Sequence, residues 1–310
     1  MTTALAAQAS PAQALGRRRL EGIALVVLSG CCFATLGIFN RLAGAKGINI
    51  LTVLTLRFGL AALLLWVLVL PRQGQGYRLG LAARQMAGFA LMGALFVTEA
   101  GLFFVSSRLI PVALTALLLY LYPALVMLLC WGLRAEAPGR AGLLALGLAL
   151  AGIALAVGSP GRQLNALGVG LGLASSLGYS IYMLLGSRLQ AGVPPLVATA
   201  WISTWAAALF LVLGLFTGGF QPLAARVAWP ELLGLAILGT VIPVFTLMAG
   251  LARITATQAS IASTVEPIAT ALMGAIFLHE ALLALQILGG VLVISAVLLL
   301  SLGGKGRSQG

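Results

Sequence analysis

Three ionisable side chains lie deep inside long apolar stretches of this sequence. They are Arg57, Glu99 and Glu266. In a hydrocarbon environment such groups are costly unless they are paired, protonated or hydrated, so they tend to face a protein interior or a water-filled cavity. Glu266 is followed by Pro267, and a proline inside a helix leaves one carbonyl without its helical partner and bends the helix. The stretch 256–280 is therefore predicted to be a polar, bent wall of a pathway.

Arg57 and Glu99 lie at matching depths in consecutive apolar segments. With about 1.5 Å of rise per residue and about 30 Å of hydrocarbon, both fall roughly 10 Å from the same membrane surface. This predicts an ion pair. Two roles are open for this pair. It either forms a fixed structural link between the two segments, or it acts as a gate that contacts an amino-acid substrate. A zwitterion needs a carboxylate for its amine and an arginine for its own carboxylate.

Glu266 lies near the middle of its segment, about 15 Å in on the same arithmetic, with no basic residue evident at that depth. A buried carboxyl without such a partner favours its protonated form. Two roles stay open. Glu266 either couples proton exchange or binds a substrate amine, or it is satisfied by Thr270 or Ser263 and shapes the bend at Pro267.

Aromatic side chains recur at helical spacing. Tyr179 and Tyr182 share one helix face, as do Trp201 and Trp205, because residues three or four apart lie on the same side. Tyr and Trp are also favoured at the membrane–water interface, which remains the alternative for the two tryptophans. The predicted helix bends are Pro123 and Pro267. The predicted pathway residues are Ser29, Phe33, Thr35, Glu99, Tyr120, Tyr122, Tyr179, Tyr182, Trp201, Ser263 and Glu266.

The composition predicts an all-α, polytopic membrane protein. Of 310 residues, 61% are hydrophobic and 8% are charged, and the mean hydropathy is +1.11. The formal net charge is +12, but the basic residues lie in short connections between apolar segments. Membrane topology explains that pattern better than nucleic-acid binding does.

Several kinds of chemistry are excluded by what the sequence lacks. It has no aspartate and one histidine, His279, so no Ser/His/Asp set can form. Six scattered glutamates do not suit a carboxylate-bound metal site, and no Walker A motif is present. Cys31, Cys32 and Cys130 have neither metal-site nor disulfide spacing. We therefore expect no enzyme activity, no metal and no cofactor.

Ten membrane spans are expected, and the connections between them carry an uneven charge. The spans are 21–40, 50–70, 85–105, 110–131, 140–158, 166–187, 196–217, 230–250, 256–278 and 282–302. The fifth and tenth spans carry almost no polar side chains and are expected to form an outer scaffold. One side of the membrane has Arg17, Arg18, Arg19, Arg72, Arg78, Arg84, Arg134, Arg140, Arg188, Arg253, Lys305 and Arg307. The other has Arg41, Lys46, Arg108, Arg162 and Arg226. By the positive-inside rule both termini are cytoplasmic.

The two halves of the chain repeat one another. Pro123 and Pro267 are each followed thirteen residues later by a glutamate, Glu136 and Glu280. The segment from Gly22 also aligns with the segment from Gly168. Five spans per repeat is an odd number, so the second half is expected to enter the membrane inverted. Inverted repeats recur in secondary transporters, which bind substrate near mid-membrane between the halves.

These paired motifs resemble the ten-helix EamA-type members of the drug/metabolite transporter superfamily. The resemblance covers nearly the whole chain and rests on Arg57-Phe58, Pro123 with Glu136, Glu266-Pro267, Glu280, Gln286 and Gly289-Gly290. Within that superfamily the chain is most similar to the YddG-like amino-acid exporters. The resemblance implies export of small metabolites across the bacterial inner membrane by alternating access, without ATP.

The expected organisation is a cytoplasmic tail (1–20), a first repeat (21–158), a second, inverted repeat (159–302) and a C-terminal tail (303–310). Expected partners are a small-molecule substrate such as an amino acid and the lipid bilayer, and the chain would act as a monomer or a homodimer. A proton-coupled exporter of hydrophobic cations is the main alternative. A carrier of phosphorylated or nucleotide-linked sugars would need more cavity Lys or Arg than Arg57 alone. A membrane transferase or a purely structural protein is disfavoured by the missing catalytic groups and by the repeat.

Overall fold

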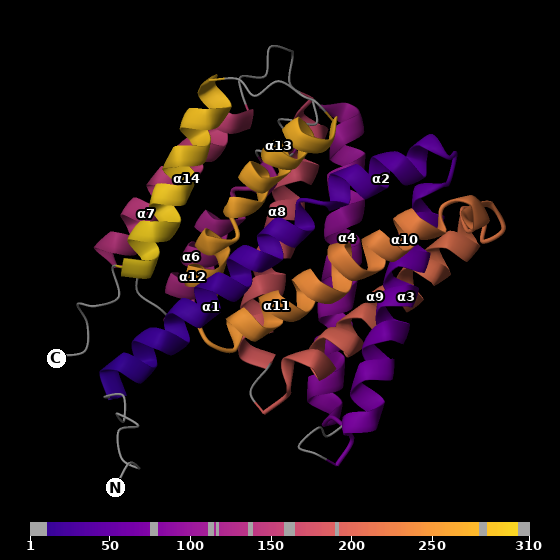
Figure 1. The fold of residues 1–310 in the computed structure, drawn as a ribbon, viewed down its shortest axis with the longest axis horizontal. Helices are drawn as coiled ribbons and strands as arrows, with labels where there is room; N and C mark the ends of the chain where they lie inside the picture. The colour runs from indigo at the N-terminus through magenta and orange to yellow at the C-terminus, as the bar shows by residue number, and fades with distance from the viewer. Residues whose placement is uncertain are drawn as a thin grey trace, which may run out of the picture.

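The computed structural model describes residues 11–74, 80–110, 115, 118–135, 139–157, 165–189, 192–278 and 284–302. Its regular elements are helices, and no β-strand occurs in these ranges (Figure 1). The predicted all-α fold class is therefore confirmed. Glu136, His279 and Glu280, and the outer parts of both tails, fall outside the described residues.

The helices of the first half overlap the predicted spans, but α1 begins ten residues before the predicted 21–40 and α6 begins twelve residues after the start of the predicted 110–131. They are α1 (Pro11–Phe33), α2 (Leu36–Ala45), α3 (Ile50–Val69), α4 (Ala83–Leu109), α6 (Tyr122–Gly132) and α7 (Arg140–Val157). A short 3₁₀ turn, Leu70–Arg72, closes α3. The first predicted span, 21–40, is thus two helices that are interrupted at Ala34 and Thr35. No proline marks this break.

The second half follows the same order. It contains α8 (Ala166–Leu189), α9 (Pro195–Phe216), α10 (Trp229–Ala236), α11 (Ile242–Leu251), α12 (Ala256–Ala262), α13 (Val265–Leu278) and α14 (Ala284–Leu302). A π-helical segment, Ile237–Val241, joins α10 to α11, and a 3₁₀ turn, Ala224–Val227, precedes α10. The predicted spans 230–250 and 256–278 are therefore each built from more than one helix.

Two prolines each free a backbone carbonyl that a polar side chain from another helix then contacts inside the apolar bundle. A proline has no N–H, so the carbonyl four residues earlier is freed. The carbonyl that Pro123 frees, on Leu119, accepts a hydrogen bond from Ser176 Oγ at 2.9 Å. The carbonyl that Pro243 frees, on Gly239, accepts one from Arg57 Nη2 at 2.6 Å. Each freed acceptor is thus satisfied by a side chain from another helix.

The long helices of one half pack mainly against helices of the other half. The largest helix–helix contacts are those of α3 with α9, α4 with α8, α1 with α11, and α7 with α14. Figure 1 shows α7 and α14 side by side at one edge of the bundle. The prediction that these two spans form an outer scaffold agrees with that position.

Length and composition make this a multi-pass membrane protein. Within the described ranges, six helices are long and apolar enough to cross a membrane. Their outer faces carry large exposed apolar side chains, as does the shorter α7; Phe216 is 88% exposed and Leu144 is 62% exposed. In water such a surface would be costly, whereas lipid tails cover it without penalty.

Candidate substrate site

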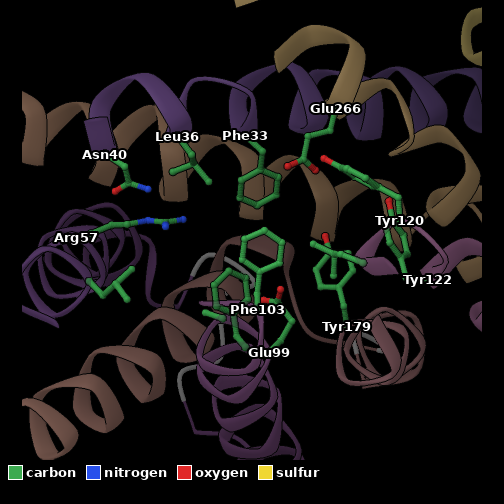
Figure 2. Close-up of a pocket in the computed structure, with 14 residues that line it drawn as sticks. Phe33, Leu36, Asn40, Arg57, Glu99, Phe103, Tyr120, Tyr122, Tyr179 and Glu266 are labelled. Carbon is green, nitrogen blue, oxygen red and sulfur yellow. The ribbon is translucent and has the colours of Figure 1, made fainter. Parts of the chain in front are cut away.

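A pocket of about 240 Å³ lies where α1, α2, α3, α4, α6, α8 and α13 meet. Both predicted carboxylates, the predicted arginine and three predicted tyrosines line it. The lining residues are Phe33, Leu36, Asn40, Leu54, Arg57, Phe96, Glu99, Ala100, Phe103, Leu119, Tyr120, Tyr122, Tyr179 and Glu266. Figure 2 shows Arg57 on one side, the tyrosines on the opposite side, and Glu266 and Glu99 on two further walls.

Arg57 is held in place by the π-helical segment. Its Nε donates to Thr240 Oγ1 at 2.7 Å and its Nη2 to the Gly239 carbonyl at 2.6 Å. The guanidinium carbon also lies 4.8 Å from the centre of the Phe58 ring. The side chain is 4% exposed and faces the pocket. These contacts fix the direction of the guanidinium.

The predicted ion pair between Arg57 and Glu99 is not formed in the structure, although both side chains line the pocket. No contact within 4.0 Å joins them among the described residues, whose ion pairs lie elsewhere. Glu99 instead accepts a hydrogen bond from Ser175 Oγ, at 3.4 Å on Oε1 and 3.2 Å on its backbone carbonyl. The physical reason is the carbonyl freed by Pro243, which offers Arg57 a closer acceptor.

Glu266 does not receive the two hydroxyls that the sequence suggested for it. Thr270 Oγ1 donates to the backbone carbonyl of Glu266 at 2.9 Å, and Ser263 Oγ donates to the carbonyl of Ala259 at 2.9 Å. Both hydroxyls thus satisfy helix carbonyls in their own segments, as Ser and Thr often do in membrane helices. The carboxylate of Glu266 points into the pocket instead (Figure 2).

A row of aromatic rings forms the pocket wall opposite Arg57 and continues behind it. Tyr122 meets Tyr179 edge-on at 4.8 Å between ring centres, and Tyr179 stacks on Tyr182 at 5.8 Å and 9°. Tyr182 in turn meets Phe96 edge-on at 5.7 Å. Tyr120 lies 6.4 Å from Tyr122. All four separations lie within the range of favourable aromatic pairs.

The remaining predicted residues are not among those that line the pocket. Ser29 Oγ donates to the Pro243 carbonyl at 2.8 Å, and Thr35 Oγ1 donates to the Cys32 carbonyl at 2.8 Å. Trp201 packs edge-on against Trp66 at 5.0 Å. Tyr182 lies behind the wall, between Tyr179 and Phe96. Ser263 bonds the carbonyl of Ala259, as described above.

Sequence reasoning missed about half of the lining. The missed residues are Leu36, Asn40, Leu54, Phe96, Ala100, Phe103 and Leu119. Apolar residues look alike in a sequence whether they face lipid or a cavity. Asn40 is the exception, because an amide at the end of an apolar segment is a detectable signal. Among the described residues, no three His, Cys, Asp or Glu side chains gather as a metal site would require.

Comparison with known proteins agrees with this architecture. The model of the EamA-like transporter family matches residues 20–158 and again residues 166–302. A protein of Archaeoglobus fulgidus described as an uncharacterized transporter is 29% identical over 284 residues, which cover 90% of this chain and 95% of that protein. A crystal structure with 19% identity aligns at a TM-score of 0.76 over 91% of this chain and 96% of its own, which shows a shared fold. The chain therefore belongs to the EamA-like transporter family and is a multi-pass membrane transporter with two copies of the family repeat.

Proposed function

We propose that this protein exports amino acids or similar small zwitterions by alternating access, without ATP, across the bacterial inner membrane. The observation that carries the proposal is the pocket itself. It places two carboxylates, Glu99 and Glu266, and one guanidinium, Arg57, around a single space. Charged groups of both signs facing one cavity suit a small molecule that carries both signs itself.

The geometry leaves donors and acceptors for both ends of such a molecule. A guanidinium has five N–H donors, and Arg57 uses Nε and Nη2 on the π-helical segment, so further N–H groups can meet a substrate carboxylate. The carboxylate of Glu266 is available for a substrate amine. Tyr120, Tyr122 and Tyr179 flank it with ring faces that also attract cations.

The size of the pocket favours a small metabolite. A cavity of about 150 Å³ holds a benzene molecule, and this pocket measures about 240 Å³. Sites for drug-sized ligands usually begin near 300 Å³. The space therefore suits an amino acid with an apolar side chain against Leu36, Leu54 and Phe103.

We further propose the ten-span, inverted arrangement with both termini in the cytoplasm and repeats at 21–158 and 159–302. The contacts of α1 with α11 and of α4 with α8 support it. The first contact joins span one to span eight, and the second joins span three to span six. Span six is the equivalent of span one and span eight that of span three, so each contact is the counterpart of the other, as expected if one axis relates the halves. The pairs α3–α9 and α7–α14 join equivalent spans across the same axis.

Proton-coupled export of a hydrophobic cation is the second candidate. It is favoured by the excess of carboxylates over cations in the pocket and by the hydrogen bonds that already engage Arg57. Aromatic rings with a nearby carboxylate are a known way to hold such cations.

The test is efflux from proteoliposomes loaded with a panel of amino acids and with cationic dyes, with and without a pH gradient. We expect amino-acid efflux at a rate that does not depend on the pH gradient. In Glu266→Gln the efflux rate should fall by about tenfold or more, because a desolvated charge-assisted contact is lost. Glu231→Gln is the matched control. This carboxylate pairs with Lys46 at 2.7 Å, away from the pocket.

The outcomes separate the two candidates. Dye efflux that rises with the gradient, together with no amino-acid efflux, would replace the zwitterion with a cation as the substrate. Unchanged transport in Glu266→Gln would remove this carboxylate from either mechanism.

A further inference from the structure

A second cavity, of about 590 Å³, lies at the end of the bundle where α1 begins. It is enclosed by the start of α1, the ends of α6, α8 and α11, and the turn that leads into α12. Its described lining residues are Leu15, Arg19, Cys130, Ala135, Leu184, Ser187, Arg188, Leu251, Ala252, Arg253, Ile254, Thr255, Ala256 and Gln258. None of them lines the first pocket.

The two cavities lie on the same helices, one above the other. On α8, Tyr179 lines the first pocket and Leu184 the second cavity, five residues or about 7.5 Å further along. On α6, Tyr122 and Cys130 are separated by about 12 Å in the same way. On α1 the separation from Phe33 to Arg19 is about 21 Å, so the second cavity lies further along the same helices, beyond a layer of one to four helical turns.

That layer is closed. Val26 on α1, Val126 on α6 and Met183 on α8 lie between the residues that line the two cavities, and each is 0% exposed. Ala262, at the end of α12, is also fully buried. The structure thus holds two compartments with a packed apolar plug between them.

The second cavity differs from the first in its charged lining residues. Arg19, Arg188 and Arg253 line it, and no carboxylate is among its described lining residues. The hydroxyls of Ser187 and Thr255 and the amide of Gln258 add polar groups to the wall. Three guanidinium groups around one space create a positive potential that concentrates anions.

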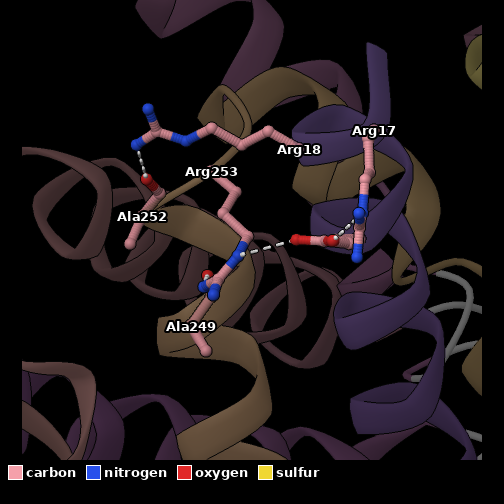
Figure 3. A network of polar contacts seen from close by, with 6 residues as sticks. Arg17, Arg18, Ala249, Ala252 and Arg253 are labelled. Atoms are coloured by element: carbon pink, nitrogen blue, oxygen red, sulfur yellow. Dashed lines mark hydrogen bonds and ion pairs between the residues drawn. The ribbon is translucent and has the colours of Figure 1, made fainter. Parts of the chain in front are cut away.

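A polar network ties the start of α1 to the end of α11 at this end of the bundle. Arg18 donates to the Ala252 carbonyl at 3.1 Å, and Arg253 Nη1 donates to the Ala249 carbonyl at 2.7 Å (Figure 3). Glu21 pairs with Arg17 at 3.0 Å and reaches Arg253 Nε at 3.9 Å. Glu21 does not line the cavity, and Glu136 lies outside the described residues.

We propose that the second cavity is an anion-binding vestibule, in which the carboxylate of the substrate binds before the plug opens. This assignment to the substrate rests on the proposed function. A zwitterion would be held by its carboxylate among the arginines and then, beyond the plug, by its amine at Glu266 and Glu99. Guanidinium groups suit the first task because their paired N–H donors match a carboxylate.

The experiment measures the charge preference of the vestibule without measuring transport. In the full-length protein, with the three native cysteines replaced by alanine, Ser187→Cys places one thiol in the cavity. The thiol is treated in neutral-lipid proteoliposomes with an anionic reagent, sulfonatoethyl methanethiosulfonate, and a cationic one, trimethylammonioethyl methanethiosulfonate. We expect faster reaction with the anionic reagent. Arg188→Gln or Arg253→Gln should each lower the ratio of the two rates roughly two- to sixfold, which is the effect of removing one charge at a separation of about one Debye length, ~8 Å.

Arg84→Gln is the matched control, because it removes the same charge near the start of α4 without lining the cavity. In this variant the ratio of the anionic to the cationic reaction rate should equal that of the parent protein. Equal rates for both reagents, or no reaction with either, would overturn the proposal, as would an equal effect of Arg84→Gln.

A second arm identifies the anion. Added carboxylates or phosphate should slow the reaction of the thiol at position 187 in neutral lipid, which indicates a soluble anion. Protection by anionic phospholipid, with none from soluble anions, would instead assign the cavity to a lipid headgroup and overturn the vestibule. Because the thiol reaction needs no transport, the expected charge preference with no amino-acid efflux would contradict the proposed function and the assignment to its substrate, and would leave the anion site itself supported.

Discussion

At the scale of single residues, Arg57 is positioned by a backbone defect. Pro243 frees the Gly239 carbonyl and the chain passes through a π-helical turn, so two acceptors, that carbonyl and Thr240 Oγ1, meet the guanidinium. Thr240 is fully buried and also donates to the Leu235 carbonyl at 3.1 Å. The hydroxyl of Thr240 therefore joins the arginine to the helix that carries the defect.

Thr240→Val should weaken both stability and substrate binding. Valine has the same shape but no acceptor, so the buried Nε of Arg57 loses its partner at a cost of about 1–3 kcal/mol. We expect a lower Tm of the purified protein and a higher KM for efflux. Thr240→Ser keeps the hydroxyl and should restore both. A valine variant that matches the parent in Tm and KM would show that Thr240 does not position Arg57.

At the scale of elements, the apolar segments and the helix breaks next to Pro123 and Pro267 could be predicted from the sequence. Segments such as 140–158 and 196–217 are long, continuous and bounded by Pro, Gly or Arg, so their ends fall within a few residues of α7 and α9. The interruption at Ala34 and Thr35 could not be predicted, because no proline or polar run marks it. The partner of Arg57 could not be predicted either, since a freed carbonyl has no side-chain signature.

We predict that the break between α12 and α13 acts as a hinge during the transport cycle. Pro267 cannot donate to the Ser263 carbonyl, which instead accepts from Glu266 N at 3.0 Å, and the helix restarts at Val265. In Pro267→Ala the new N–H can continue the helix, which should stiffen the wall that carries Glu266. We expect an unchanged or higher Tm and a maximal transport rate lower by about threefold or more.

Pro230→Ala is the control for this change. Pro230 lies in the first turn of α10, where its missing N–H has no acceptor within the helix. Its transport rate should match the parent. If Pro267→Ala also transports at the parental rate, the break has no part in the transport cycle.

The crossing of α1 and α11 depends on two glycines. A Cβ on Gly250 would lie 2.5 Å from Val26 Cγ2 and 3.0 Å from the Gly22 carbonyl oxygen. Gly250→Ala should therefore force the helices apart and lower the Tm by several degrees, at a cost of about 1–3 kcal/mol. At Gly147 on α7 a Cβ would meet nothing within 4 Å. Gly147→Ala should be neutral or slightly stabilising, and a similar Tm for both variants would refute the close crossing.

At the scale of the whole molecule, the proposed inverted arrangement predicts on which side of the membrane each connection lies. Gln73 and Gln221 are both exposed, near the ends of α3 and α9, and should lie on opposite sides of the membrane. Single cysteines at these positions, treated with a membrane-impermeant maleimide on intact cells, should label at 221 alone. Permeabilised cells should label at both. Labelling of both in intact cells would contradict the inverted topology, and labelling of 73 alone would reverse the orientation.

The interlocking of the two halves also has a consequence for biosynthesis. The main partners of α1, α3, α4 and α7 are α11, α9, α8 and α14, which the ribosome makes only later. At about 5–20 residues per second, residues 159–302 take on the order of 10 s to emerge. During that interval the first repeat lacks these partners, and Arg57 lacks the acceptors on Gly239 and Thr240. We therefore expect that slower translation of the second half lowers the yield of folded protein.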